Sequence, residues 1–236
     1  MIYPYTVALH GVMALLSLLS SIYLFYRKRD TDNESIGAFF YWFLYYFIYN
    51  FILALSIIIA GELNELVGIS YAIALVFQGF AAWNAFNVAL NLAGFNFFIR
   101  KSFSWLYLLG MLIASMLHLI YFEIPIGTSD AKWVLWYSNQ PRSLFFTFFM
   151  FVAGWTFALV HFKALFLLHS AALKMRAFFF ALAAFILPFA AWFYFGAQDV
   201  NDIFFAFLFA ILGLVFLAVG NVVIGVLKGE WISAKE

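Results

Sequence analysis

The sequence predicts an all-α, polytopic membrane protein, a bundle of seven transmembrane helices with the N-terminus outside and the C-terminus in the cytoplasm. Three observations predict this class. Hydrophobic residues make up 67% of the 236-residue chain and charged residues only 10%, whereas soluble domains are about half apolar and about a quarter charged. Seven segments are apolar over at least the roughly 20 residues that cross a bilayer. Finally, lysine and arginine gather in alternate loops.

The predicted spans are separated by short polar breaks. Arg27–Ser35 and Gly196–Asp202 are rich in charged residues, Asn, Asp or Gly, which favour turns. Arg100 and Lys101 close the third span. The whole chain, residues 1–236, is therefore expected to form a single transmembrane domain. Its predicted spans are Pro4–Tyr26, Gly37–Ala60, Ser70–Ile99, Phe103–Ile124, Ser143–Leu168, Ala171–Phe195 and Asp202–Leu227.

The distribution of basic residues predicts the orientation, because cytoplasmic loops carry an excess of lysine and arginine. Only Lys132 and Arg142 fall on the side of the N-terminus. The other ten basic residues fall on the opposite side: Arg27, Lys28, Arg29, Arg100, Lys101, Lys163, Lys174, Arg176, Lys228 and Lys235. The first span is too long for a signal-peptide core and lacks a basic flank before it, so we expect it to be retained as an anchor.

The longest loop, Pro125–Pro141, is expected on the outer side. Its Trp133, Trp136 and Tyr137 favour a short helix lying in the membrane interface. The same residues fit two interpretations. They could form an ordinary aromatic belt at the membrane surface, or they could form a lid over an external pocket.

Two spans carry small residues on one face, which lets helices approach closely in lipid. We expect these two faces to meet each other or a neighbouring helix. Pro188, deep inside the sixth span, predicts a kink, as either a static bend or a hinge. The residues are Ala177, Ala181, Ala184, Pro188 and Ala191 in the sixth span, and Ala206, Ala210, Gly213 and Gly220 in the last.

Polar residues inside the spans are the candidate ligand-binding residues, because they are costly in lipid and usually face the bundle interior. Asn84, Asn87 and Asn91 share one face of the third span. His161 and Asn221 lie at comparable depth on the fifth and last spans. One interpretation is hydrogen bonding between helices, at about 0.6 to 2 kcal/mol for each bond. The other is a polar cavity for a small ligand or ion.

His10 and His118 are the candidate metal or haem ligands. Each lies about 8–10 Å inside the outer boundary of its span, and two histidines at equal depth can hold a haem or share a metal. The alternative is a histidine hydrogen-bonded between helices. The first and fourth helices need not touch, so no cofactor is expected and haem is kept as an alternative. The chain has no Cys, which excludes thiolate metal sites and disulfides.

Motifs for enzymatic or nucleic-acid functions are missing from the sequence. It contains no HExxH, no Gly-rich phosphate loop and no serine nucleophile with a nearby base. No span has an acidic residue at its centre, which argues against a proton pump or an ion-coupled carrier. The 12 basic and 11 acidic residues nearly balance, so no nucleic-acid partner is expected. The expected surroundings are the lipid bilayer of the cell (plasma) membrane.

The layout is similar to two families. Seven spans with an outer N-terminus resemble rhodopsins, but Asp202–Leu227 lacks the central lysine that would bind retinal, so retinal is not expected. Arg27-Lys28-Arg29 before an aromatic span, together with the turn Ser170–Ala177, resembles the seven-helix membrane module at the N-terminus of some bacterial sensor histidine kinases. That resemblance implies a bacterial, sensor-like protein. Only about eight residues follow the last span, so sensing would pass to a separate partner.

These observations favour a non-enzymatic membrane protein that binds a small or lipidic ligand or a partner protein. Two alternatives stay open: a haem-binding or redox membrane subunit, and a structural accessory subunit of a larger membrane complex. A visible absorption spectrum would separate the first alternative from the others, and the size of the particle in mild detergent would separate the second.

Overall fold

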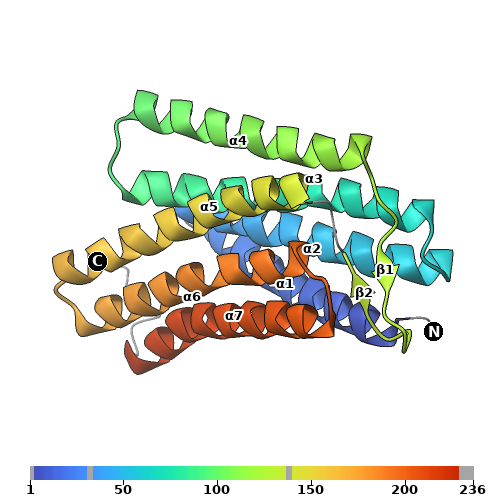
Figure 1. The fold of residues 1–236 in the computed structure, drawn as a ribbon. Coiled ribbons are helices and arrows are strands. Elements are labelled where there is room, and N and C mark those ends of the chain that lie inside the picture. Colours follow the sequence, from blue (N-terminus) through green and yellow to red (C-terminus); the bar gives the residue numbers. More distant parts are fainter. Residues whose placement is uncertain (1–2, 31–33, 137–139, 229–236) are drawn as a thin grey trace.

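The computed structural model describes residues 3–30, 34–136 and 140–228. Over these residues the chain forms seven long helices and one short β-hairpin (Figure 1). Each helix is long and apolar enough to cross a membrane, which confirms the predicted class of helical membrane protein. The helices are α1 (Pro4–Asp30), α2 (Glu34–Ala60), α3 (Glu65–Leu92), α4 (Phe97–Ile120), α5 (Gln140–Leu167), α6 (Ala171–Phe195) and α7 (Val200–Lys228).

Six of the seven described helices pack as an open ring. α1, α2 and α3 follow one another, α5, α6 and α7 follow one another, and α3 joins the two groups by packing against α5. α4 lies outside the ring, against α3 and α5 (Figure 1). α1 packs extensively against α2, and α7 against α6, whereas α1 and α7 have little direct backbone contact with each other. The ring therefore has a seam between α1 and α7.

α6 and α7 form the most extensive helix pair of the bundle, which confirms that their small residues permit close approach. Ala181 of α6 is completely buried, and a Cβ at Gly213 of α7 would lie 2.5 Å from the Leu187 side chain. α5 approaches α6 in a similar way. Gly154 faces Pro188 and the carbonyl oxygen of Ala184, so a glycine lies opposite the proline inside α6.

The break between α3 and α4 lies earlier than the charged residues predicted. α3 ends at Leu92, and Gly94 takes a positive φ of 77°, a conformation that glycine adopts without steric cost. Asn96 then caps α4, because its side chain accepts a hydrogen bond from the backbone N–H of Ile99 at 2.9 Å. Arg100 consequently lies in the first turns of α4. The turn chemistry, and not the basic pair, sets this boundary.

The loop Pro125–Pro141 forms a hairpin over its described residues, so the predicted interfacial helix was wrong. β1 (Ile126–Gly127) pairs antiparallel with β2 (Val134–Leu135). The turn closes through a hydrogen bond from the Thr128 backbone N–H to the carbonyl oxygen of Trp133 at 3.0 Å. Exposed Asp130 accepts a hydrogen bond from the Thr128 hydroxyl, which lowers the pKa of this carboxyl below its ordinary value. Tyr137 lies outside the described residues.

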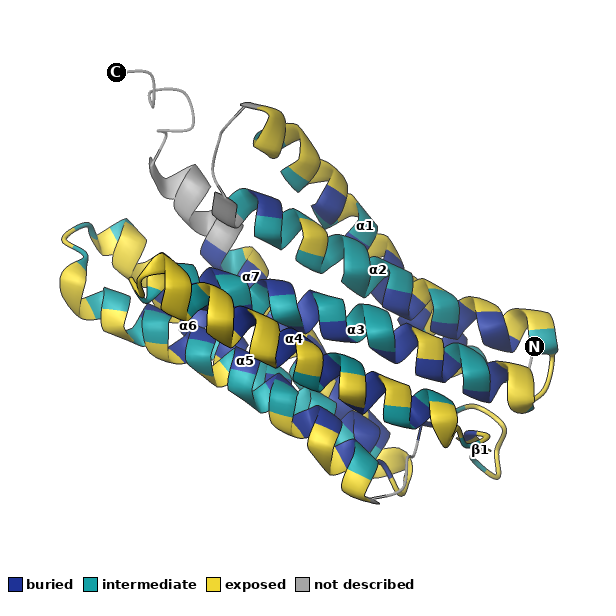
Figure 2. Cartoon of the chain, turned by 90° about the horizontal axis from the view of Figure 1, so that it is seen from above, coloured by how far each residue is buried: buried dark blue, intermediate teal, exposed yellow. Residues whose placement is uncertain are grey.

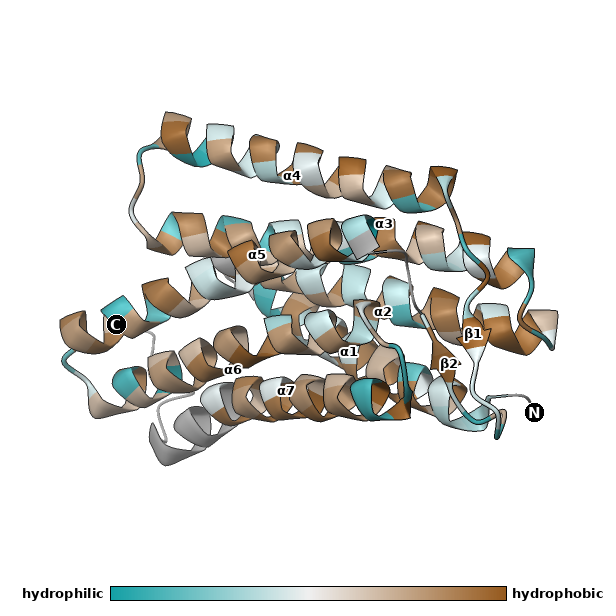
Figure 3. Ribbon diagram, viewed as in Figure 1, coloured by the Kyte–Doolittle hydropathy of each residue, from teal (hydrophilic) through white to brown (hydrophobic). Residues whose placement is uncertain are grey.

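The bundle is apolar on its outer surface and carries polar side chains inside. Figure 2 shows exposed residues along the outward faces of the helices, and Figure 3 shows that these faces are largely hydrophobic. Phe98, Leu159 and Phe166 are among the most exposed side chains, at 78%, 69% and 86% of their surface. The buried polar residues include Thr6, His10, Ser17, Ser21, Asn50, Asn84, Ser115, His118, Thr147 and His161. This distribution suits a chain surrounded by lipid.

Candidate functional site

A cavity of about 160 Å³ lies between the helices of the ring. Its walls extend from Phe39 to Asn50 on α2, from Ala184 to Phe195 on α6 and from Ala206 to Leu217 on α7. Each of these stretches rises about 16 Å at about 1.5 Å per residue. The volume is close to that of an engineered apolar cavity of about 150 Å³ that binds benzene. The cavity therefore has room for a small molecule about the size of one ring with short substituents.

Small side chains create this space. α5 contributes Ala153 and Gly154, and α7 contributes Ala206 and Ala210. Bulky rings from α2 keep the opposite wall at a distance. Some of the small residues that the sequence assigned to helix contacts thus have a second role, because they leave a void where larger side chains would have closed the ring.

A hydrogen-bond network forms the polar end of the cavity. His10 Nδ1 lies 2.8 Å from Asn50 Oδ1, and the Tyr194 hydroxyl lies 2.9 Å from His10 Nε2. Asn50 Nδ2 donates to the carbonyl oxygen of Tyr46 at 2.9 Å. His10 and Asn50 are each only 2% exposed. The network joins α1 to both α2 and α6.

The chemistry of these groups fixes the direction of each hydrogen bond. Since Asn50 Oδ1 can only accept, His10 Nδ1 carries the hydrogen in this pair. In the neutral imidazole Nε2 then has a lone pair and accepts from the Tyr194 hydroxyl. Both nitrogens of the His10 ring are therefore engaged, and the network is complete without a charged group.

Gln78 differs from the other polar residues that line the cavity. Its Oε1 atom is buried, and no described group donates a hydrogen bond to it. A buried acceptor without a partner costs about 1–3 kcal/mol. Ala82 and Ala85 continue the same face of α3 along the cavity wall. Gln78 thus brings to the wall of the cavity a buried side-chain acceptor to which no described residue donates.

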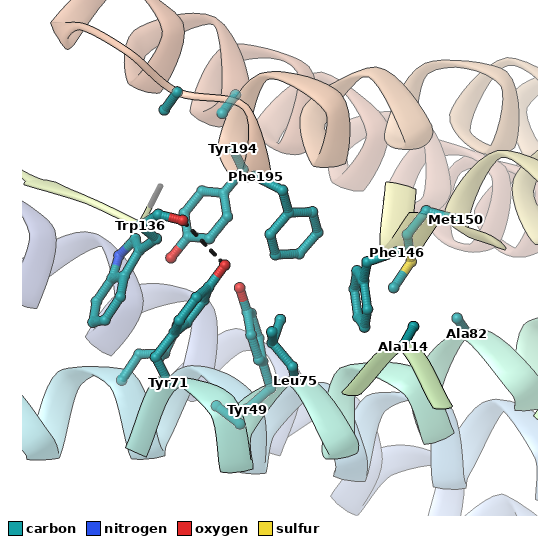
Figure 4. Packing of buried hydrophobic residues seen from close by; sticks show 14 of the residues in the cluster. Tyr49, Tyr71, Leu75, Ala82, Ala114, Trp136, Phe146, Met150, Tyr194 and Phe195 are labelled. Carbon is teal, nitrogen blue, oxygen red and sulfur yellow. Dashed lines mark hydrogen bonds between the residues drawn. The ribbon is translucent and has the colours of Figure 1, made fainter. Parts of the chain in front are cut away.

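The hairpin covers the polar end of the cavity with Trp136. This side chain is completely buried, and its ring stacks on Tyr71 with centroids 5.1 Å apart and meets His10 edge-on at 6.0 Å. The Tyr71 hydroxyl donates to the carbonyl oxygen of Trp136 at 3.1 Å (Figure 4). The backbone N–H of Val134 donates to Thr6 Oγ1 at 2.8 Å, which fastens the hairpin to α1. Of the two interpretations of this loop, the arrangement of Trp136 favours the lid.

His10 and His118 do not face each other. A row of ring contacts runs from His10 through Trp136 and Tyr71 to His118. His118 Nδ1 lies 2.8 Å from the carbonyl oxygen of Ala114 in its own helix. A haem or metal held by both imidazoles would displace the two intervening rings, so the geometry favours histidines that serve as hydrogen-bonding side chains. Over the described ranges, no three His, Asp or Glu side chains gather as a metal site.

The asparagines of α3 lie away from the cavity. Asn84 is 7% exposed, and its Nδ2 donates to the carbonyl oxygen of Phe80 in the same helix at 2.8 Å. The oxygen of Asn91 accepts from the Arg100 guanidinium, which joins α3 to α4 near their turn. Asn87 is half-buried on the same face. None of the three lines the cavity, whose α3 wall is formed by Gln78 and its neighbours. Their role in ligand binding stays a prediction.

His161 lies beyond the end of the cavity that Phe157 borders. Its ring stacks on Phe157, a cavity-lining residue, with centroids 4.2 Å apart, and meets Phe180 at 5.5 Å. Its Nδ1 is 2.9 Å from the carbonyl oxygen of Phe157. Asn221 belongs to α7, but its side chain lies outside the part of the chain that the structure describes. A shared ligand site of His161, Asn221 and the α3 asparagines stays a prediction.

No protein-family model matches this chain, and comparisons with curated proteins and with solved structures find no match. The functional argument therefore depends on the geometry of the cavity and its polar residues.

Proposed function

We propose that this protein is a non-enzymatic, seven-helix integral membrane protein that binds a small, largely apolar ligand in the cavity between its helices. It would act as a sensor-like module of the bacterial cell membrane and pass the bound state to a separate protein partner. The observation that carries the proposal is the cavity of about 160 Å³, closed at one end by the His10–Asn50–Tyr194 network.

The packing of the cavity supports a ligand. The cavity is partly open, and the apolar side chains that line it lack packing partners on the side that faces the space. A ligand that fills the space would supply those contacts and would stabilise the folded state.

The architecture supports a sensor-like role because the ligand would touch both halves of the ring. Met13 and Asn50 border the cavity from the α1–α3 group, and Ala153 and Ala210 border it from the α5–α7 group. A ligand between two groups joined mainly through α3 and α5 biases their separation. A partner protein bound at the end of the bundle opposite the hairpin would respond to a change in that separation.

The orientation is proposed from the basic residues. The turns α3–α4 and α5–α6 lie at the end of the bundle opposite the hairpin and the start of α1 (Figure 1). Arg27, Lys28, Arg100, Lys101 and Lys174 all belong to that end. Because basic residues favour the cytoplasmic side, we place the hairpin outside and this end inside.

Thermal unfolding of the purified protein in mild detergent tests the proposal, with toluene and p-cresol as the ligands. A bound ligand at about a hundred times its Kd stabilises the folded state by about 2.7 kcal/mol, so the Tm should rise with ligand concentration. Ala210→Leu fills part of the cavity and should abolish the rise, whereas Ala218→Leu on the exposed face of α7 should retain it. If no ligand raises the Tm of the wild-type protein, or if Ala210→Leu responds as the wild type does, the proposed binding site is wrong.

A further inference from the structure

We infer that the ligand is an uncharged alcohol or phenol that reaches the cavity from within the bilayer, through the seam between α1 and α7. This inference rests on the proposed function and deepens it, because it names the chemical class of the ligand and its route. It is argued from the lining of the cavity, from Gln78 and from the way the ends of the ring are closed.

The lining of the cavity selects against charge. Among the residues that the structure describes, no Asp, Glu, Lys or Arg borders it, and its wall is formed mainly by aromatic, aliphatic and small side chains. An ionised ligand would lose its hydration without gaining a counter-charge, which is costly in an apolar interior. An uncharged molecule avoids this cost.

The hydrogen-bonding residues select for a hydroxyl group. Gln78 borders the cavity and its buried Oε1 has no donor among the described residues, whereas Asn50 and His10 are already paired with each other. A hydroxyl both donates and accepts, so it can pair with the oxygen or the nitrogen of the Gln78 amide after rotation about the last side-chain torsion. A ketone or ether only accepts and leaves Gln78 Oε1 without a donor. The hydroxyl is therefore the best match.

The two ends of the cavity fix how such a molecule would lie. His10 and Asn50 form the polar end, below the hairpin, whereas Phe39, Phe157 and Leu217 form the apolar inner end. The hydroxyl would point towards Gln78 and the polar end, and the apolar body would lie towards the inner end.

The ends of the ring are closed, which leaves the seam as the route. On the outer side Trp136 is completely buried over His10, and the His10 ring meets Phe207 of α7 at 5.9 Å. On the inner side Phe39 meets the rings of Phe157 and Phe180 at 5.9 and 6.3 Å. Between these closures α1 and α7 have little backbone contact, and both helices face lipid. A ligand dissolved in the bilayer can enter there without crossing water.

The class of ligand is tested with a matched pair, p-cresol and toluene, which differ by one hydroxyl. Their affinities are measured by isothermal titration for the wild-type protein and for Gln78→Met, which has a similar shape without the amide. Removal of the amide should reduce the p-cresol affinity about tenfold, the change expected for one buried hydrogen bond, and leave the toluene affinity nearly unchanged. The comparison of variants cancels the different partitioning of the two molecules into detergent. Benzoate, which is ionised, should not bind.

The outcomes separate this inference from the proposed function. If both molecules bind and Gln78→Met weakens them equally or not at all, the hydroxyl assignment is wrong and the cavity remains a binding site. Binding of benzoate as tight as that of p-cresol would also overturn the assignment. If neither p-cresol nor toluene binds the wild-type protein, the proposed function fails together with the inference.

The route is tested by closing the seam with a cross-link. The chain has no native Cys, so the reagent reacts only with the introduced cysteines. α1 and α7 begin at the same end of the bundle, so the His10–Phe207 contact places Met13 level with Ala210, three residues further along each helix. The double variant Met13→Cys/Ala210→Cys is linked by a short bifunctional thiol reagent with a reducible centre. We expect p-cresol to associate at least about tenfold more slowly in lipid nanodiscs and to recover its rate after reduction. Because both residues also border the cavity, the Kd is measured on the same linked sample. Closing the route slows association and dissociation alike and leaves the Kd unchanged, whereas a weaker Kd with an unchanged association rate would contradict the lateral route.

A second cross-link serves as the control. Tyr5 and Trp133 meet with ring centroids 5.3 Å apart, so Tyr5→Cys/Trp133→Cys fixes the hairpin to α1 without touching the seam. This link should leave the association rate unchanged. A rate slowed by the hairpin link and unaffected by the seam link would show access from the outer aqueous side and would overturn the lateral route.

Discussion

The contact between Gly154 and α6 leads to a prediction about a single methyl group. A Cβ added at Gly154 would lie 2.8 Å from the carbonyl oxygen of Ala184 and closer still to the ring of Pro188. Neither neighbour can move by rotating a side chain, because one is helix backbone and the other is a proline ring. α5 and α6 would have to separate. We therefore expect Gly154→Ala to lower the free energy of unfolding by about 1–3 kcal/mol, the usual cost of overpacking.

Two other glycines provide matched controls for the same chemical change. A Cβ at Gly11 of α1 meets nothing within 4 Å, so Gly11→Ala should gain up to about 1 kcal/mol from the better helix propensity of alanine. A Cβ at Gly213 meets the tip of the Leu187 side chain at 2.5 Å, and that side chain can rotate away. The free energy of unfolding of Gly213→Ala should therefore lie between those of Gly11→Ala and Gly154→Ala.

Thermal unfolding in detergent, followed by circular dichroism, measures the series. The expected order of Tm is Gly11→Ala highest, then Gly213→Ala, then Gly154→Ala. Since Gly154 also lines the cavity, Gly154→Ala should alter the affinity for p-cresol as well as the stability. A Gly154→Ala variant as stable as Gly11→Ala would refute the close approach of α5 and α6 on which the shape of the cavity depends.

Three further predictions follow from other parts of the bundle. Trp136→Ala should lower the free energy of unfolding by about 3–5 kcal/mol, because the ring is completely buried even though the residue lies in a loop. Trp105→Ala is the control and should cost far less, because that side chain is 56% exposed. Asn84→Leu should leave the titrated affinity for p-cresol unchanged, because the amide bonds its own helix and does not line the cavity; a tenfold loss would place the ligand on the asparagine face instead. Gly94→Ala should lower the free energy of unfolding by about 1–2 kcal/mol, because the backbone φ of 77° is unfavourable for alanine. Gly94→Asn should lower it less, because asparagine tolerates this conformation better, and the Tm values of the two variants check the order.

The helical class and the spans could be predicted from the sequence, because the physics of the bilayer acts on each segment separately. Length and apolarity decide whether a helix can cross, and α6 begins and ends where the sequence predicted, at Ala171 and Phe195. The α3–α4 boundary was harder because it depends on one glycine and one capping asparagine, Gly94 and Asn96, beside a more conspicuous basic pair. The hairpin depends on contacts with α1, such as that of Val134 with Thr6, which no local pattern reveals.

The candidate site was harder to predict, since it depends on which helices become neighbours. His10 could be singled out from the sequence, but its partners Asn50 and Tyr194 are 40 and 184 positions away. The Asn84 face was conspicuous because of its spacing, whereas Gln78 has no polar neighbour at helical spacing on the cavity face of α3, where Ala82 and Ala85 follow it. No signal in the sequence pointed to Tyr194.

The difference between donors and acceptors explains why a conspicuous polar face need not be a site. Inside a helix a carbonyl oxygen can accept a second hydrogen bond, so a donor on a short side chain such as that of Asn or His can bond the carbonyl four residues earlier. Asn84, His118 and His161 each pair with that carbonyl of their own helix. A side-chain acceptor has no such choice, because the backbone N–H groups are already used by the helix.

Side-chain acceptors inside the bundle must therefore find donors on other elements or on a ligand. Asn50 Oδ1 finds His10 on α1, and Asn91 Oδ1 finds Arg100 on α4. Gln78 Oε1 finds no donor among the described residues, yet its side chain borders a cavity large enough for a small molecule. In a bundle of this kind, the site is identified by a side-chain acceptor that receives no hydrogen bond from its own helix or from a neighbouring helix. The ligand that fits such a site is one that supplies a hydrogen-bond donor.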